Sequence, residues 1–294
     1  MVSTVAVVGC GMMGRGIMEV SAMAGLAVKG VKNTPGSIDK PRQAIEKSLQ
    51  RRVQKGKMTA EQAQEVLSRI EFTTDVAAVS AADIVVESVV EDEATKVALL
   101  TQVEAHMHPE AVLGSNTSSL RLETLAGALA RPQNFVGLHF FSPVPAMALV
   151  ELGAVPATAD YAMQRASAFC QAIDKTPVVV QSSPGYVVNR LLVPYLLHGI
   201  ETLESGIASA QDIDTAMKLG CGHPMGPLAL SDLIGLDVVR AMAETLAREL
   251  GSDRYRMPES LIKLTDNQQL GRKSGIGIFD YSGAEPALNP ALAK

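Results

Sequence analysis

The sequence contains no tryptophan, only 4% aromatic residues, and a net charge of −5. Nucleic-acid-binding domains typically carry a basic surface with aromatic side chains, so this composition argues against nucleic acid as a partner. No segment approaches the roughly 20 consecutive apolar residues that a membrane-spanning helix needs. The chain does not open on a basic segment followed by a long apolar stretch, and we therefore expect neither a membrane partner nor a signal peptide.

Cysteine is also scarce. The three cysteines, Cys10, Cys170 and Cys221, are widely spaced and odd in number, which argues against a disulfide framework and favours a reduced, cytoplasmic location. We expect no metal site. With 294 residues, of which 47% are hydrophobic and 19% charged, the chain is long enough for a large core and most naturally forms two domains.

The N-terminal stretch has the pattern of a dinucleotide-binding unit. A short apolar strand, Val5–Val8, runs directly into GCGMMG at 9–14, and an amphipathic helix follows and ends at Gly25. In such a unit the first glycine permits a tight turn, the second lets the backbone approach a pyrophosphate, and the third allows close helix–strand packing. The helix N-terminus offers free N–H groups to the phosphates. The residues predicted to bind the cofactor here are Gly9, Gly11, Met12, Met13 and Gly14.

The second predicted strand, Leu26–Lys32, departs from the usual NAD pattern. An NAD-binding unit typically ends this strand in Asp or Glu, which binds the ribose 2′-OH. Here that position falls at about Lys32, followed by Asn33 and Thr34, and no acidic residue occurs before Asp39. A cation at this place does not repel a 2′-phosphate, so NADP is possible alongside NAD. The alternative is that Lys32 simply points into water.

A basic helical hairpin is predicted over about 38–70. Residues 40–57 contain seven basic residues and one acidic residue, and apolar residues at helical spacing give the segment a core face. Gly56 ends the first helix, and Thr59 with Gln62 predicts a capping box that opens a second helix, Ala60–Ile70. The basic face suits a phosphate-bearing substrate arm or an acidic carrier protein, but a solvated helix face is the simpler alternative.

Two further strands are expected to end at the ligand-binding edge of the sheet. The strand Asp83–Glu87 is followed closely by Glu91. The strand Val112–Gly114 is followed by five small polar residues, 115–119. Ligands bind at the carboxyl ends of parallel strands in such sheets, so Glu91 and Lys96 are expected near the cofactor. The polar run either caps a helix or contacts nicotinamide and substrate.

The stretch 138–151, LHFFSPVPAMALVE, carries the candidate catalytic pair. It predicts a strand, Val136–Phe141, a stiff turn containing two prolines, and a second strand, Ala148–Leu152. If the second strand folds back beside the first, His139 and Glu151 come close enough to pair. The carboxylate would then fix the imidazole tautomer and leave the other ring nitrogen to take a proton from a hydroxyl. A structural role for the pair is the alternative reading.

Beyond a last strand, Thr176–Gln181, the pattern changes. Pro184 and Gly185 interrupt it, and we place the domain boundary within 182–186, which gives domains of 1–182 and 183–294. Asn189 begins the first helix of the second domain. No further strand is expected before Ile276–Tyr281, and the tail after Gly283 is expected to be loose.

These motifs together resemble the 3-hydroxyacyl-CoA dehydrogenase family over essentially the whole chain, most closely its short bacterial 3-hydroxybutyryl-CoA type. The segments that carry the resemblance are GCGMMG at 9–14, SNTSSL at 115–120, LHFFSPVPAMALVE at 138–151, PGYVVNRLL at 184–192, GCGHPMGPLAL at 220–230 and GRKSGIGIFDY at 271–281. The resemblance implies a doubly wound α/β (Rossmann) domain with the inserted hairpin, an all-α C-terminal domain that forms a homodimer, and an active site in the cleft between the two domains.

The resemblance also implies site residues. His139 matches the general base and Glu151 the residue that orients it, while Ser118 and Asn189 match substrate contacts. Near the cofactor lie the positions matched by Glu91, Lys96, Asn116 and Lys273, and the positions that touch the CoA arm match Ser48 and Lys55, with Arg51 beside them. Two departures stand out: Lys32 occupies the place of the usual Asp, and Ser142, which we also assign to the cofactor site, occupies that of the usual Asn.

The sequence therefore predicts the reversible oxidation of a 3-hydroxyacyl-CoA to the 3-ketoacyl-CoA, with NAD or NADP as the hydride acceptor. One alternative is the same chemistry on an acyl group carried by an acyl-carrier protein, or on a related hydroxyacyl substrate. An alternative of another class is a non-catalytic binding protein on the same scaffold, against which the intact set of candidate catalytic residues argues.

Overall fold

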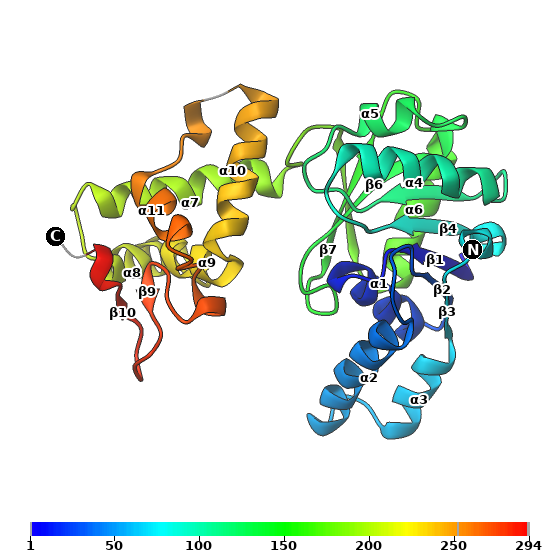
Figure 1. Cartoon of the computed structure of the whole chain (residues 1–294), viewed down its shortest axis with the longest axis horizontal. Helices are drawn as coiled ribbons and strands as arrows, with labels where there is room; N and C mark the ends of the chain where they lie inside the picture. The colour runs from blue at the N-terminus through cyan, green and yellow to red at the C-terminus, as the bar shows by residue number, and fades with distance from the viewer. Residues whose placement is uncertain (1, 252, 293–294) are drawn as a thin grey trace. The chain divides into compact units, whose positions relative to one another are not determined.

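A computed structural model describes residues 2–251 and 253–292 (Figure 1). The chain divides into two compact units, 1–186 and 187–294. The first unit contains one eight-stranded sheet in the order β3-β2-β1-β4-β5-β6-β7-β8. Neighbouring strands are parallel from β3 to β6, β6 and β7 are antiparallel, and β7 and β8 are parallel again. This is the doubly wound α/β architecture that the sequence predicts.

The strands of the sheet have these bounds: β1 Thr4–Val8, β2 Ala27–Val31, β3 Ile70–Thr73, β4 Ile84–Glu87, β5 Val112–Ser115, β6 Phe135–Phe140, β7 Leu149–Ala154 and β8 Thr176–Gln181. The helices of the first unit are α1 Met12–Met23, α2 Asp39–Gln54, α3 Ala60–Ser68, α4 Glu93–His106, α5 Leu122–Gly127 and α6 Asp160–Ala172, and its 3-10 turns are η1 Val76–Ala81 and η2 Pro132–Asn134.

Both faces of the sheet are buried by helices. One core contains side chains of α1, α2, α3 and α6 packed on the strands, and the other contains side chains of α4, α5 and η1. Strands covered on both faces read as nearly continuous apolar runs rather than alternating ones, and β1, β4 and β6 are buried over almost their whole length. The carboxyl ends of β1, β2, β4, β5 and β6 are therefore left as the place for ligands.

The inserted hairpin is present as α2 and α3 (Figure 1). The capping box is confirmed: the Thr59 hydroxyl accepts the Gln62 backbone N–H, and the Gln62 side chain accepts the Thr59 backbone N–H. The predicted end of α3 is wrong, because the helix stops at Ser68 and Ile70 starts β3, the edge strand beside β2. A four-residue strand is too short to show a period in sequence, and its pairing with β2 decides its conformation.

The second unit is helical, with α7 Val188–Glu204, α8 Ala210–Cys221, α9 Pro227–Ile234, α10 Leu236–Leu250 and α11 Glu259–Asp266, three 3-10 turns, η3 Asp253–Tyr255, η4 Arg272–Ser274 and η5 Pro290–Leu292, and two short strands, β9 Phe279–Asp280 and β10 Ala287–Leu288. The strand in 276–281 is confirmed, but the expectation of a loose tail is wrong for 284–292. There β10 pairs with β9, and the buried Asn289 side chain donates to the carbonyl of Gly277 at 2.6 Å. Residues 293–294 lie outside the described part.

No helix in the described ranges is both long and apolar enough to cross a membrane. The three cysteines, Cys10, Cys170 and Cys221, are not joined to one another by disulfides.

Candidate active site

The candidate catalytic pair lies where β6 and β7 run antiparallel. His139 and Glu151 are direct cross-strand partners, and His139 Nδ1 lies 2.8 Å from Glu151 Oε2. The pairing that the sequence predicted is therefore present. Both residues are buried, with His139 at 5% and Glu151 at 1% exposure, so the carboxylate interacts with the imidazole and other protein groups rather than with bulk water. A carboxylate on Nδ1 fixes the tautomer in which Nε2 carries a free lone pair, which is the state that accepts a proton.

The turn between these strands is held by a lysine that the sequence analysis did not single out. Lys175, at 8% exposure, donates to the carbonyl oxygens of Val144 and Met147 at 2.9 and 2.8 Å. These carbonyls belong to the proline-containing turn, so Lys175 fixes the chain reversal on which the His139–Glu151 pairing depends. Ser142 lies in the same turn and is exposed.

Asn116 fixes the end of β6 next to the pair. Its side-chain oxygen accepts the backbone N–H of Phe140 at 3.0 Å, and its amide nitrogen donates to the Ser88 hydroxyl at 3.2 Å. The residue therefore joins the loops after β4, β5 and β6. The structure gives it a positioning role beside the predicted cofactor contact.

Glu91 organises the polar run after β5. Its carboxylate accepts the Thr117 hydroxyl at 2.7 Å and the backbone N–H groups of Ser118 and Ser119 at 2.8 and 3.0 Å. The hydroxyl of Ser119 lies 3.0 Å from the same oxygen and that of Ser118 lies 3.3 Å away. Burial alone would raise the pKa of the Glu91 carboxyl, but the Lys96 ammonium and these hydrogen bonds hold that pKa below its ordinary value. The Ser118 hydroxyl has the longest of these bonds, and its predicted contact with substrate stays a prediction.

Lys96 lies beneath this loop rather than at its surface. Its side chain is fully buried and pairs with Glu87 at 2.6 Å and with Glu91 at 3.5 Å. Glu87 also accepts the Ser115 hydroxyl at 2.5 Å. The ammonium therefore supports the loops after β4 and β5 from inside, and the predicted role of Lys96 near a cofactor stays a prediction. Glu87 was missed as a site residue, although an acid that ends a buried strand nine positions before a lysine was a visible signal.

The glycine-rich turn fits a dinucleotide phosphate. A side chain at Gly9 would lie 2.2 Å from the Ser88 carbonyl oxygen, and one at Gly14 would lie 1.9 Å from the Gly9 carbonyl oxygen. At Gly11, by contrast, nothing lies within 4 Å of that position, so the backbone is open to an incoming group. No side chain caps the N-terminus of α1, which begins at Met12 and Met13. Free N–H groups and an open backbone are what a pyrophosphate needs.

Lys32 lines an open cavity of about 680 Å³ formed by the ends of β2 and β3 and by α4. Its ammonium donates to the carbonyl oxygens of Thr34 and Pro35 and to the Thr34 hydroxyl. It therefore folds onto its own loop and does not simply point into water. None of the described residues that line this cavity is acidic, so nothing there repels a phosphate.

The hairpin residues separate into one half-buried serine, which contacts α1, and two exposed cations. The Ser48 hydroxyl donates to Glu19 of α1 at 3.0 Å, and burial raises the pKa of the Glu19 carboxyl. Ser48 thus ties α2 to α1. Arg51 and Lys55, one helical turn apart, are exposed, and their predicted contact with the CoA arm stays a prediction.

The remaining predicted residues belong to the second unit. Asn189 lies in the first turn of α7 and is buried, at 9% exposure. Lys273 lies in η4 and forms an ion pair with Asp237 at the start of α10. The contacts predicted for Asn189 and Lys273 stay predictions.

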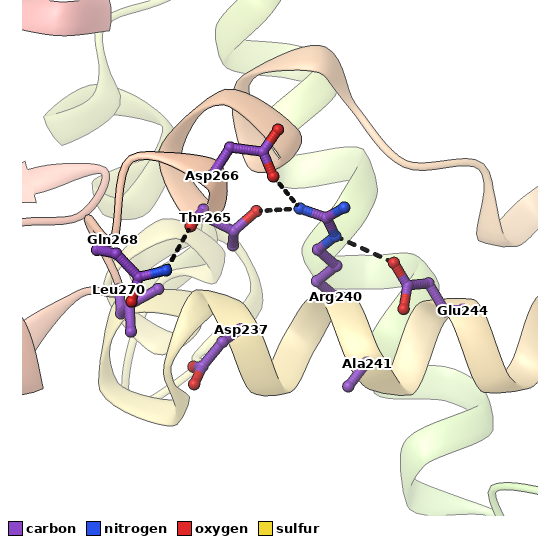
Figure 2. Close-up of a pocket in the computed structure, with 8 residues that line it drawn as sticks. All are labelled: Asp237, Arg240, Ala241, Glu244, Thr265, Asp266, Gln268 and Leu270. Carbon is purple, nitrogen blue, oxygen red and sulfur yellow. Dashed lines mark hydrogen bonds and ion pairs between the residues drawn. The ribbon is translucent and has the colours of Figure 1, made fainter.

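A polar pocket of about 550 Å³ adjoins Asp237 on α10 (Figure 2). At its centre Arg240 donates to Glu244 at 3.0 Å, to the Thr265 hydroxyl at 2.8 Å and to Asp266 at 2.6 Å. The one cation that lines the pocket is thus held by neighbouring acceptors. The arrangement joins α10 to α11, and we assign it a structural role.

Comparison with known proteins gives one consistent result. Residues 4–183 match the model of the 3-hydroxyacyl-CoA dehydrogenase NAD binding domain, and residues 185–281 match that of the 3-hydroxyacyl-CoA dehydrogenase C-terminal domain. A 3-hydroxybutyryl-CoA dehydrogenase of Mycobacterium tuberculosis is 42% identical over 282 residues, which cover 95% of this chain and 99% of the relative. Human mitochondrial hydroxyacyl-coenzyme A dehydrogenase is 40% identical over 288 residues, covering 95% and 91%.

Solved structures agree. The crystal structure of (S)-3-hydroxybutyryl-CoA dehydrogenase from Ralstonia eutropha superposes with a TM-score of 0.91 at 38% identity and covers 96% of this chain and all of that one. A 3-hydroxybutyryl-CoA dehydrogenase from Escherichia coli gives a TM-score of 0.93 at 36% identity, with 98% of this chain and 61% of the other covered.

Proposed function

The chain belongs to the 3-hydroxyacyl-CoA dehydrogenase family, and from this premise we propose that it interconverts a 3-hydroxyacyl-CoA and the corresponding 3-ketoacyl-CoA. We further propose a short acyl chain such as 3-hydroxybutyryl, because the three bacterial relatives described above are named 3-hydroxybutyryl-CoA dehydrogenases. The observation that carries the proposal is the buried His139–Glu151 pair at the ligand-binding end of the sheet.

In the oxidation direction, His139 Nε2 takes the proton of the substrate hydroxyl. The hydride leaves C3 of the substrate, and the bound nicotinamide dinucleotide supplies the acceptor for it. The electron pair of the C–H bond leaves with the hydride, the pair of the O–H bond forms the second bond of the ketone, and the proton converts His139 into an imidazolium. Glu151 stabilises that imidazolium through Nδ1, and its burial strengthens the interaction.

Positioning completes the proposed mechanism. Ser118, in the loop fixed by Glu91, and Asn189 of the second unit are the proposed contacts to substrate oxygens. A hydroxyl held within hydrogen-bonding distance of Nε2 reacts faster because the orientation is fixed before the reaction begins. The exposed Arg51 and Lys55 are the proposed contacts to the phosphates of the CoA arm.

For the cofactor we propose that the site accepts NADP(H) as well as NAD(H). Lys32 replaces the expected carboxylate, and the described lining of its cavity contains no acid. Any preference for NADP(H) over NAD(H) is expected to be modest, because the 2′-phosphate must compete for the Lys32 ammonium with the loop oxygens that already accept hydrogen bonds from it.

The test is reduction of acetoacetyl-CoA, followed through the near-ultraviolet absorbance of NADH or NADPH. Turnover with either cofactor supports the proposed reaction, and failure with both refutes it. Lys32→Asp should lower kcat/KM for NADPH by roughly tenfold or more, equivalent to about 1.4 kcal/mol, and leave NADH at least as good. If the ratio of kcat/KM for NADPH to that for NADH were the same in Lys32→Asp as in wild type, Lys32 would not contact the cofactor. Lys29→Asp, which changes a half-buried cation of β2 that pairs with Glu71 outside this cavity, is the matched control.

A further inference from the structure

Tyr186, the last residue of the first unit, has a backbone conformation that is energetically unfavourable for a residue with a bulky side chain. Its φ is +49°, in the left-handed region that bulky residues rarely adopt. Its side chain is almost completely buried, at 3% exposure. Strain of this kind persists only where the surrounding packing fixes it, and it is concentrated at functional sites.

The Tyr186 ring lies in a hollow on the sheet, next to the catalytic pair, where two glycines leave room for it. Gly137 and Gly153 are cross-strand partners on β6 and β7, two residues before His139 and two after Glu151. Because side chains alternate along a strand, the glycine pair and the catalytic pair share one face of the sheet. A side-chain carbon at Gly137 would lie 2.4 Å from the Tyr186 hydroxyl oxygen, and one at Gly153 would lie 3.0 Å from the Tyr186 ring.

The ring that fills this hollow also covers the imidazole. The rings of Tyr186 and His139 stack with centroids 4.8 Å apart and planes 26° apart. The phenol hydroxyl, by contrast, has no hydrogen-bond partner among the residues that the structure describes. Burial, with the nearby Glu91 and Glu151 carboxylates, raises the pKa of this phenol, so it stays protonated. The contact to His139 is made by the ring and not by the hydroxyl.

We propose that Tyr186 is a positioning residue for His139, an inference that rests on the proposed dehydrogenase function. One hydrogen bond from Nδ1 to Glu151 and a tilted contact with the Phe141 ring, with centroids 4.4 Å apart and planes at 51°, limit but do not fix the rotation of the imidazole about its Cβ–Cγ bond. A stacked ring on its face removes this freedom and holds Nε2 in one direction. Catalytic geometry tolerates errors of only about 10–20°, so loss of the ring lowers the rate of proton transfer more than it weakens binding.

The first test compares Tyr186→Phe with Tyr186→Leu in the full-length protein. The Phe variant keeps the stack and removes an unpartnered hydroxyl, so it should retain kcat within about twofold and melt no lower than wild type. The Leu variant should lose roughly tenfold or more in kcat, with KM for acetoacetyl-CoA within about twofold, because orientation is worth at least that much. Equal kcat in Leu and wild type would overturn the proposal, and so would an equal loss in Phe and Leu.

A second test covers the case in which Tyr186→Leu fails to fold. Gly137→Ala places a methyl group against the Tyr186 oxygen, and it should push the ring off His139 and lower kcat. Adding Tyr186→Phe removes that oxygen and should restore kcat, whereas adding Leu122→Ala, which frees the other neighbour of the methyl group, should not. If Leu122→Ala, and not Tyr186→Phe, restored kcat to the Gly137→Ala variant, the loss would come from crowding against Leu122, and the role of Tyr186 would be refuted.

A readout independent of turnover separates this proposal from the proposed function. The imidazole resonances of His139, assigned by their absence in His139→Gln, should carry the ring-current shift of a stacked aromatic ring in wild type and in Tyr186→Phe. In Tyr186→Leu they should lose the part of this shift that comes from the Tyr186 ring and keep the part that comes from Phe141, whose ring centroid lies 4.4 Å away. If the wild type shows the stacked signature but reduces no acetoacetyl-CoA, the proposed function fails while the positioning of His139 stands. If the signature is the same in Leu as in wild type, the positioning proposal fails.

Discussion

Replacing Glu151 by glutamine should damage turnover while leaving substrate binding nearly intact. The carboxylate is 1% exposed and bonds to His139 Nδ1 at 2.8 Å, so the neutral amide keeps the shape of the site and removes only the charge. A full imidazolium about 4 Å from a carboxylate charge gains roughly 4 kcal/mol at an effective dielectric constant of about 20. If roughly half of the proton has been transferred in the transition state, about 2 kcal/mol is lost, which corresponds to about 30-fold in kcat.

The tautomer makes this figure a lower bound. The amide nitrogen of a glutamine at 151 can donate to Nδ1, which leaves the proton of the imidazole on Nε2 and disables the base in that fraction of molecules. We therefore expect at least a 30-fold loss in kcat for oxidation, with KM for 3-hydroxybutyryl-CoA within about threefold.

The assay is the oxidation of 3-hydroxybutyryl-CoA at saturating cofactor, the direction in which His139 acts as a base, with thermal unfolding measured on the same samples. Glu104→Gln is the matched control. Glu104 is another buried carboxylate of the first unit, at 7% exposure, but it accepts the backbone N–H groups of Ala130 and Arg131. It should lower stability without lowering kcat. A folded Glu151→Gln variant with kcat within threefold of wild type would refute the electrostatic argument and the assignment of Glu151.

Four further outcomes are expected. His139→Gln should fold and lower kcat by at least ~10²-fold, the usual value of a positioned base, and near-normal turnover would contradict its role. The double variant Arg51→Glu with Lys55→Glu should raise KM for an acyl-CoA but not for an N-acetylcysteamine thioester. The difference in KM should shrink as salt rises, because exposed charges are screened over ~10 Å at 0.1 M. An equal loss of activity on both thioesters would instead indicate a folding defect. Light scattering at micromolar concentration should show a dimer formed by the second unit, where Leu191 and Leu219 are 69% and 82% exposed, and a 31.0 kDa particle would exclude it. The pKa of the Glu91 carboxyl is lowered in the folded protein from 4.5, so the stability that the ionised carboxylate contributes is complete above pH 4.5 and is lost as the pH falls through the folded pKa. In denaturant titrations, wild type should therefore lose more stability on acidification than Glu91→Gln. Equal losses in the two proteins would contradict this prediction.

Features encoded within a few adjacent residues were predicted well. The glycine-rich turn and the Thr59 capping box each depend on residues within one turn of chain, and both are present as expected. The strand–turn–strand segment around His139 was also placed to within a residue or two, because the prolines and the apolar runs mark its limits.

Features that depend on a distant partner were not predicted. The strand β3 forms because its four residues pair with β2, and β10 forms because β9 lies opposite. Tyr186 reads as the ring in a Pro-Gly-Tyr turn, and only the fold shows that the ring stacks on His139.

The predicted pairing of His139 with Glu151 depends on strand register, which local sequence alone does not fix. A slip of one residue between β6 and β7 would move one partner to the opposite face of the sheet and place its charge in the apolar core. Three contacts from outside the strands oppose such a slip. Asn116 binds the backbone at the end of β6, Lys175 holds the turn, and the Tyr186 ring fits only where Gly137 faces Gly153. Since each contact comes from a different segment, the geometry of the base is a property of the whole first unit, and substitutions far from His139 in sequence can alter catalysis without touching substrate.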